Sequence, residues 1–203
     1  MIIDFSLSFK NYEEKILNFY GVWSYPCPSC QAKRWNRHGG YSRHFIVLCD
    51  GNLVDEQLSI LRLLCRSCKH THAILPSECI PWGLYSICTL LEILETFLEV
   101  QSITKTSAKY NISWQCIYCF LQKLSVYSSS LELLFREQSL WVPAKKPSLI
   151  ETISLLRRNL FLRESFFHSF RKYLFLTRKR TSAYFYYMGT DKFTFCCSHI
   201  AFE

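Results

Sequence analysis

Two pairs of closely spaced cysteines constrain this chain more than any other feature. Cys27-Pro28-Ser29-Cys30 is one CxxC motif, and Cys65-Arg66-Ser67-Cys68 is the second. The two-residue gap lets a tight turn aim both sulfurs at one point, and two such turns together supply the four soft donors of a tetrahedral zinc site. We therefore predict a structural Zn²⁺ ion. A closed four-cysteine site keeps no open position for catalysis, so this ion stabilises the fold. The expected ligands are Cys27, Cys30, Cys65 and Cys68.

Other side chains near these motifs have two possible roles. Several potential ligands lie close in the sequence, and any of them could replace a cysteine: His38, His44, His70, His72 and Cys49. We expect the histidines that follow the second motif to be surface or hydrogen-bonding residues instead. Four cations are placed to offset the excess charge of the thiolates: Lys33, Arg34, Arg66 and Lys69.

Length and charge indicate the environment of the cysteines. The chain has 203 residues, enough for a hydrophobic core without disulfides. It begins Met1-Ile2-Ile3-Asp4 and lacks the basic region of a secretory signal. Its most apolar stretches, 84–100 and 160–176, carry charged residues that would be costly in lipid. We expect a soluble cytoplasmic protein with reduced cysteines, in which paired CxxC motifs bind metal.

The hydrophobic period changes along the chain. Short β-type runs at 44–48 and 58–64 flank a hairpin signal, Asp50-Gly51-Asn52. A possible helix over 11–20 precedes them. Spacings of three and four residues then predict a helix from Leu84 to Val100. Shorter helices are predicted at 102–109, 113–125 and 131–138, with residues 127–130 ending the preceding block.

The C-terminal third begins after a linker signal at 142–148. Ser148 is placed to cap a helix that starts at Leu149, with Glu151 as its capping-box partner. Two aromatic runs, 184–187 and 193–195, predict a hairpin. The fold class is therefore α+β, with a small antiparallel zinc ribbon followed by a mainly α-helical part. The predicted regions are a zinc ribbon (1–82), a helical region with a helix-turn-helix (83–141) and a basic, aromatic segment (149–203).

The segment 107–124 fits a helix-turn-helix. Ser107 is small enough for a close helix crossing, and Asn111 tolerates the left-handed backbone of the turn. Ser113 then caps the second helix. The buried side chains of this motif are expected to be Ile112, Ile117, Phe120, Leu121 and Leu124. An ordinary helical hairpin with a polar face remains the alternative.

An exposed face of the second helix is the candidate DNA reader. Its expected outward residues are Trp114, Gln115, Tyr118 and Gln122. Residues near the start of such a helix reach base edges, and Gln hydrogen-bonds adenine through both of its polar atoms. Three lysines are expected to contact phosphates: Lys105, Lys109 and Lys123.

The net charge of +8 permits a polyanionic partner, and the charge is unevenly placed. Residues 157–180 hold eight Lys and Arg against one acid, Glu164. This segment suits DNA, RNA, an acidic membrane surface or simple solvation of a helix face. Residues 70–104 instead carry Glu78, Glu92, Glu95 and Glu99.

Several catalytic chemistries lack support. Trp114-Gln115-Cys116-Ile117-Tyr118-Cys119 resembles a redox WxCxxC, but no βαβ pattern precedes it, so two packing cysteines are expected. Cys196-Cys197-Ser198-His199 is interpreted as incidental rather than as a second metal site. Too few carboxylates follow residue 125 for a two-metal nuclease or transposase core, and there is no HxE with PCxxC and no phosphate-binding glycine loop. We expect no enzymatic activity.

The order of motifs resembles a known family. CPSC is followed by His38-Gly39-Gly40-Tyr41-Ser42-Arg43, then by the run 61–76 and by Pro81-Trp82. This resembles an uncharacterised bacterial family of domains of unknown function with CPxC, HGxYxR and CxxCxxTHAxLP motifs and a downstream helix-turn-helix. It is more distantly similar to the zinc-ribbon and helix-turn-helix heads of insertion-sequence transposases. The match runs from Pro26 to Leu124 and implies a transposon-type DNA-binding module without the catalytic domain.

Two functions follow as expectations. The first is a non-catalytic, zinc-stabilised protein that binds double-stranded DNA, a transposon-associated or transposase-like regulator. The second is a protein-interaction adaptor, in which the helix 84–100 and the aromatic C-terminus bind a transposase or another copy of the chain. A dithiol oxidoreductase using Cys116 and Cys119 is a distant third.

Overall fold

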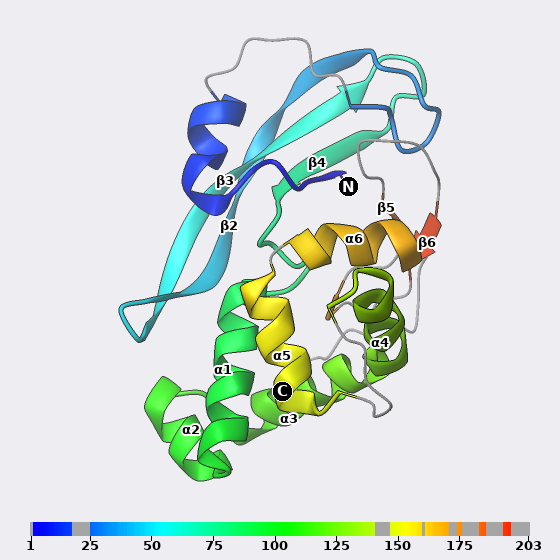
Figure 1. Cartoon of the computed structure of the whole chain (residues 1–203). Coiled ribbons are helices and arrows are strands. Elements are labelled where there is room, and N and C mark those ends of the chain that lie inside the picture. The colour runs from blue at the N-terminus through cyan, green and yellow to red at the C-terminus, as the bar shows by residue number, and fades with distance from the viewer. Residues whose placement is uncertain are drawn as a thin grey trace. The chain divides into compact units, whose positions relative to one another are not determined.

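A computed structural model gives an α+β fold in which a four-stranded sheet is followed by several helices (Figure 1). The structure describes residues 2–17, 25–140, 147–159, 161–170, 174–175, 183–185 and 193–195. The chain divides into two compact units. Unit 1 comprises 1–45, 55–84 and 177–203, and unit 2 comprises 46–54 and 85–176. The three predicted regions, with boundaries near 82 and 149, stay a prediction.

The sheet is mixed rather than wholly antiparallel. Its strands are β1 (Ile2–Asp4), β2 (Trp35–Cys49), β3 (Asn52–Cys65) and β4 (Thr71–Pro76), in the order β1-β4-β3-β2. β4 is antiparallel to β3, with His72 opposite Leu63. β1 pairs in parallel with β4, with Ile2 opposite Ile74. A three-residue strand, Ile2–Asp4, is too short to show a periodicity, so the parallel strand was not predicted.

The predicted hairpin between β2 and β3 is confirmed, with strands longer than expected. Asp50 and Gly51 both have positive φ, 49° and 81°, as a two-residue type I′ turn requires. Within β2, Gly39 also has positive φ, 73°. A Cβ on the next residue, Gly40, would lie 2.8 Å from the Ile60 carbonyl oxygen. Glycine at 40 is therefore needed for close approach of two backbones.

Tyr12 links the N-terminal turns to the sheet of unit 1. It follows a 3₁₀ turn, η1 (Phe9–Asn11), and precedes a π-helical turn, η2 (Glu13–Leu17). These short turns replace the helix expected over 11–20, of which residues 18–20 lie outside the described part. The buried Tyr12 hydroxyl donates to the Ile74 carbonyl (2.7 Å) and accepts from the Leu61 amide (3.1 Å). Burial raises the pKa of Tyr12 well above its usual value, so the hydroxyl keeps its proton.

Unit 2 is built from helices whose starts are set by serine caps. They are α1 (Ile87–Val100), α2 (Ile103–Tyr110), α3 (Trp114–Val126), α4 (Ser128–Glu137), α5 (Leu149–Arg158) and α6 (Phe161–Phe170). Four serines each accept a hydrogen bond from the amide three residues on: Ser86, Ser102, Ser113 and Ser148. The predicted capping box of Ser148 and Glu151 is confirmed.

Two predicted boundaries in unit 2 were wrong. α1 begins at Ile87 instead of Leu84, because Ser86 caps it. α4 begins at Ser128, so the serine run 128–130 is its first turn and does not end the preceding block. Tyr127 is both the C-cap of α3 and the N-cap of α4, which leaves no room for a loop. Serine is favoured at helix starts as well as in turns, so a serine run at the start of a helix can be mistaken for a linker.

The C-terminal strands form a second, two-stranded sheet. β5 (Ala183–Phe185) is antiparallel to β6 (Phe193–Phe195), with Tyr184 opposite Thr194. This confirms a hairpin there. The connecting residues lie outside the described part, as do residues 142–146 of the predicted linker and most of 171–180. Among the described residues, no helix is both long enough and apolar enough to cross a membrane.

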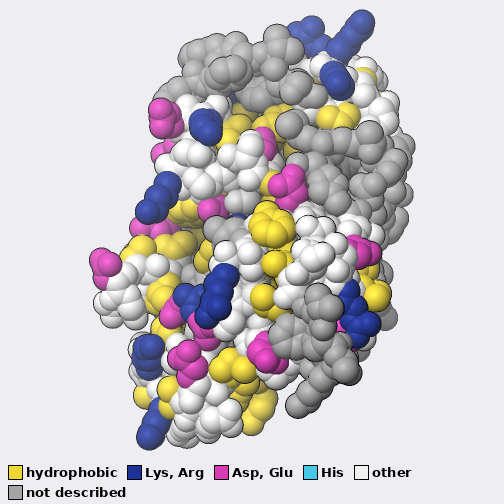
Figure 2. Space-filling model, in the orientation of Figure 1, with side chains coloured by type: hydrophobic (Ala, Val, Ile, Leu, Met, Phe, Trp, Pro, Cys, Tyr) yellow, Lys and Arg dark blue, Asp and Glu magenta, His cyan; other side chains and the backbone are white. Residues whose placement is uncertain are grey.

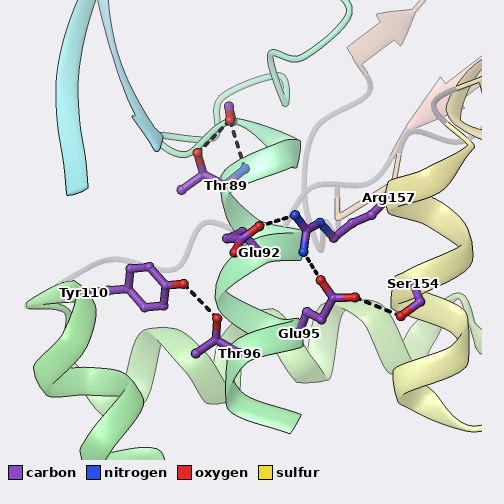
Figure 3. A network of polar contacts seen from close by, with 8 residues as sticks. Thr89, Glu92, Glu95, Thr96, Tyr110, Ser154 and Arg157 are labelled. Atoms are coloured by element: carbon purple, nitrogen blue, oxygen red, sulfur yellow. Dashed lines mark hydrogen bonds and ion pairs between the residues drawn. The ribbon is translucent and has the colours of Figure 1, made fainter. Parts of the chain in front are cut away.

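Charges are distributed differently over the two units. On the face drawn in Figure 2, Lys and Arg side chains gather at the end of unit 1 that carries the loops before β2 and after β3. Over the helices of unit 2, cations and acids lie side by side. On α1, Glu92 and Glu95 are half-buried, whereas Glu99 is exposed. Figure 3 shows Arg157 of α5 ion-paired with Glu92 and Glu95, and Ser154 donates to Glu95 (2.8 Å).

Replacing Tyr12 by phenylalanine tests the buried hydroxyl. The Tyr12→Phe change leaves a buried amide and a buried carbonyl without their partner, so we expect the free energy of unfolding to fall by about 1–3 kcal/mol. Urea denaturation measures the change. Tyr41→Phe, at an exposed tyrosine of β2, is the control and should leave stability within about 0.5 kcal/mol. Equal midpoints for the two variants would contradict this role of Tyr12.

Candidate metal centre and helix pair

The four predicted cysteines lie together in unit 1. Their Sγ atoms are all within 4.8 Å of one another. The closest pairs join the two motifs: Cys27 to Cys68 at 3.5 Å and Cys30 to Cys65 at 3.6 Å. A tetrahedral ion with metal–sulfur bonds of about 2.3 Å needs sulfurs roughly 3.8 Å apart. The donor set therefore fits a metal ion.

The two CxxC turns have the same backbone geometry. In the first, the Gln31 amide donates to the Cys27 carbonyl (2.8 Å), and the Cys27 amide donates to the Ala32 carbonyl (2.9 Å). In the second, the Lys69 amide donates to the Cys65 carbonyl (3.0 Å), and the Cys65 amide donates to the His70 carbonyl (2.9 Å). The residue after each motif is left-handed, with φ of 64° at Gln31 and 62° at Lys69. This conformation folds the chain back, so both sulfurs of a motif face one point.

Backbone amides also donate hydrogen bonds to the cysteine sulfurs, which lowers the pKa of the thiols. The Ser29 amide donates to Cys27 Sγ (3.4 Å). Burial nevertheless raises the pKa of Cys27 to about 12. The pKa of Cys65 is instead lowered to about 7: burial raises it, but the amides of Cys68 and Ser67 and hydrogen bonds from neighbouring thiols outweigh burial. Cys65 is thus more readily converted to thiolate than Cys27.

His72 is the histidine that the fold brings to the cluster. It lies on β4 with 7% of its surface exposed, and its Nε2 is 3.7 Å from Cys27 Sγ. Trp35 packs edge-on against its ring, with centroids 5.7 Å apart. Burial lowers the pKa of His72 to about 3, so the ring is neutral. A hydrogen-bonding role was expected for this residue, but its particular partner, Cys27, depends on the β3–β4 register.

The side chains of the remaining candidate ligands are not part of the four-cysteine cluster. His38, His44 and His70 are exposed, and His44 pairs with Asp55 (3.0 Å). Cys49 is an exposed free thiol at the end of β2. Residues 196–199, the weaker metal motif of the C-terminus, lie outside the described part.

The helix pair α2–α3 has the connection expected at residues 111–113. Asn111 is left-handed (φ 50°, ψ 46°), and the Ser113 side chain accepts from the Cys116 amide (3.4 Å). Ser107 donates through its hydroxyl to the Ile112 carbonyl. The buried side chains of the pair include Ile112, Cys116, Ile117, Phe120 and Leu124. Leu121, which was expected to be buried, is half-buried. Assignment as a DNA-binding helix-turn-helix stays a prediction.

The outer face of α3 carries the predicted reading residues. Trp114 and Tyr118 are each 53% exposed, and their rings meet edge to face with centroids 5.7 Å apart. Gln115 and Gln122 are exposed as well. Of the predicted phosphate contacts, Lys105 and Lys109 are exposed, with Lys109 Nζ 4.8 Å from the Tyr110 ring centroid, and Lys123 is half-buried.

The redox motif lacks its usual setting. Cys116 is buried and accepts a hydrogen bond from the Ser113 hydroxyl (3.3 Å), and Cys119 is half-buried on α3. The preceding element is the helix α2, whereas a thioredoxin-type cysteine follows a buried strand. Packing cysteines suit this arrangement.

Comparison with protein families finds one domain. Residues 27–114 contain a domain of unknown function, DUF6431. The matched segment starts at the first cysteine of the cluster, contains all four, and ends at the first residue of α3. No curated protein matches the chain, and no solved structure matches it. An uncharacterised domain was expected here, whereas the particular motifs of that family and the similarity to transposase heads stay predictions.

A pair of serine substitutions tests the metal centre. Cys30 and Cys49 are both exposed free cysteines, but only Cys30 is in the cluster. We expect Cys30→Ser to weaken metal binding by more than about 100-fold, because even residues that merely hydrogen-bond a ligand contribute about 10- to 100-fold. Cys49→Ser should bind as the wild type does. Competition with a chromophoric chelator measures both, and equal affinities would contradict the assignment.

His72 gives a second test of the same centre. His72→Phe keeps a ring against Trp35 but removes the hydrogen bond to Cys27, so we expect about 10- to 100-fold weaker metal binding. His70→Phe, at an exposed neighbour, is the matched control and should have no effect. With Co²⁺ in the site, the thiolate-to-metal absorption band should shift only in the His72 variant. Identical spectra would contradict an interaction between His72 and the ligand.

Proposed function

We propose that this chain is a non-catalytic DNA-binding protein stabilised by a structural zinc ion. Four thiolates form the soft donor set that zinc prefers in closed structural sites. The sulfur distances and the repeated backbone turns support zinc at Cys27, Cys30, Cys65 and Cys68. The two loops with the hairpin β2–β3 then correspond to a zinc ribbon. Such an ion contributes folding free energy and takes part in no reaction.

We further propose that α2 and α3 form a helix-turn-helix and that α3 enters the major groove of double-stranded DNA. The observation that carries this proposal is the outer face of α3, where Gln115, Tyr118 and Gln122 are exposed beside Ser113 at the helix start. Glutamine amides read adenine through two hydrogen bonds, and residues in the first turns of such a helix reach base edges.

Charge around the helix pair favours the same partner. Residues 100–131 contain three lysines and no Asp or Glu. Two of the three glutamates of α1 are engaged on its other side: Glu92 and Glu95 pair with Arg157, whereas Thr96 on α1 meets the Tyr110 hydroxyl of α2 at 2.8 Å (Figure 3). The third, Glu99, is exposed. The phosphate contacts of this mode are Lys105, Lys109 and Lys123.

The order of cysteine motifs and helix pair suggests a transposon-associated or transposase-like regulator. This part of the proposal rests on the resemblance of residues 26–124 to the heads of insertion-sequence transposases. A protein-interaction adaptor is the second candidate. It is favoured by the exposed ring pair of Trp114 and Tyr118, because exposed aromatics are enriched at protein interfaces.

Binding to random duplex DNA over a salt series tests the proposal. The logarithm of the binding constant should fall linearly with the logarithm of salt concentration, by about 0.9 per phosphate contact. Lys109→Ala should weaken binding to all sequences and reduce this slope by about 1. Gln115→Ala should relax the preferred sequence at one base pair, a loss of about 1–3 kcal/mol of discrimination.

Gln138→Ala is the matched control, since Gln138 is an exposed glutamine at the end of α4. It should change neither affinity nor preference. Unchanged binding in both the Gln115 and Lys109 variants would contradict the proposal that α3 binds DNA. A wild-type protein that binds no DNA but retains a protein partner through Trp114 would favour the adaptor instead.

A further inference from the structure

Unit 1 carries a concentration of positive charge that the α3 proposal does not use. Residues 25–49 and 57–77 contain Lys and Arg but no Asp or Glu. Two of these arginines are half-buried and bond within the fold: Arg43 donates to the carbonyls of Ile80 and Gly83, and Arg62 donates to Thr71. Five cations are exposed, and we refer to them as the basic cluster: Lys33, Arg34, Arg37, Arg66 and Lys69.

The two cysteine turns place the basic cluster. Lys33 and Arg34 follow the first turn, whereas Arg66 lies inside the second and Lys69 directly follows it. Bonds between the two loops hold these residues together. The Arg66 amide donates to the Arg34 carbonyl (2.9 Å), and the Arg66 side chain donates to Asn36 (2.5 Å). The sulfur pairs Cys27–Cys68 and Cys30–Cys65 join the same two loops.

A hollow of about 360 Å³ continues this surface along β2. Its lining residues include Arg37, Tyr41, Ser42 and Ser59, together with Gly39 and Gly40. Guanidinium groups, hydroxyls and backbone amides are the groups that contact phosphate oxygens in protein–DNA complexes.

Charge balance at the metal centre does not account for the basic cluster. A divalent ion on four thiolates leaves a net charge of about −2. Two cations would offset that charge, and the cluster has five. The excess is available to an anionic partner. Figure 2 shows Lys and Arg side chains without acids between them at this end of unit 1.

We propose that the basic cluster binds the phosphate backbone of double-stranded DNA and that metal binding by the four cysteines strengthens this contact. The inference rests on the proposed function and adds a second DNA surface, in unit 1. Metal fixes the two loops that present the cations, so the arrangement of positive charge depends on metal loading. Linkage requires DNA to raise the affinity for metal by the same factor.

Paired charge removals in unit 1 test the surface. Lys33→Ala with Arg37→Ala removes two exposed cations of the basic cluster, and neither side chain has a described bond to lose. Lys10→Ala with Lys15→Ala removes two exposed lysines from η1 and η2, which adjoin Glu13 and Glu14. With a labelled random duplex, the first pair should reduce the salt slope by about 2, for every sequence tested, and the second pair should not change it.

Metal removal tests the coupling. Chelation should weaken DNA binding of the wild type by about 10-fold or more, and it should weaken the Lys33/Arg37 variant by much less, since that variant lacks the cations that the metal orders. A zinc titration with and without duplex should give the reciprocal shift in metal affinity. Wild-type metal content and thermal unfolding of the double variant establish that it is folded.

The outcomes separate this inference from the α3 proposal. If wild-type binding depends on Gln115 and Lys109 but the Lys33/Arg37 variant keeps the full salt slope, the inference is wrong and the α3 proposal stands. Equal chelation effects in both proteins would overturn the coupling. Loss of heparin or anionic-vesicle binding without loss of duplex binding would assign the basic cluster to another polyanion. A wild type that binds no duplex overturns both proposals.

Discussion

The approach of four sulfurs between two loops is the constraint on which unit 1 depends. The first loop leads into β2, and the second ends β3 and precedes β4. Fixing the sulfurs therefore fixes the ends of three strands at once. In the observed β3–β4 register His72 lies opposite Leu63, and its Nε2 is 3.7 Å from Cys27 Sγ. Tyr12 adds a second tie by hydrogen-bonding to backbone groups at positions 61 and 74.

Unit 2 consists of short helices, and local side-chain caps contribute to their stability. Short helices are marginal on their own, because the first turn orders several residues for one hydrogen bond. Serine caps reduce that cost at four helix starts, and apolar packing against α1 supplies the rest. α1 contacts α2, α3 and α5. Polar links on two sides of it then fix the orientation of its neighbours (Figure 3).

The features that could be predicted from the sequence are local ones. The CxxC pairs, the Asp50-Gly51 turn and the Ser148 cap each follow from a few adjacent residues with special backbone or side-chain chemistry. The features that escaped prediction join distant segments. β1 is a three-residue strand, Ile2–Asp4, and the sequence gives no sign of its pairing with β4. The ion pairs of Glu92 and Glu95 on α1 with Arg157 on α5 depend on packing between helices that no periodicity reveals. The position of His72 beside the cysteine cluster likewise joins distant segments and was not predicted.

The metal centre and the basic cluster are linked by electrostatics as well as by geometry. Four exposed cations on two short loops, with a fifth, Arg37, near the start of β2, repel one another, and the repulsion favours separation of the loops. A metal ion on the four thiolates would oppose this in two ways: the ion would cross-link the two loops, and the thiolates would add negative charge to the loops that carry the cations. An apolar core of the same size would supply only the first effect. A cysteine centre is therefore well suited to hold positive charge close together, because the charge it adds has the sign that the surface needs.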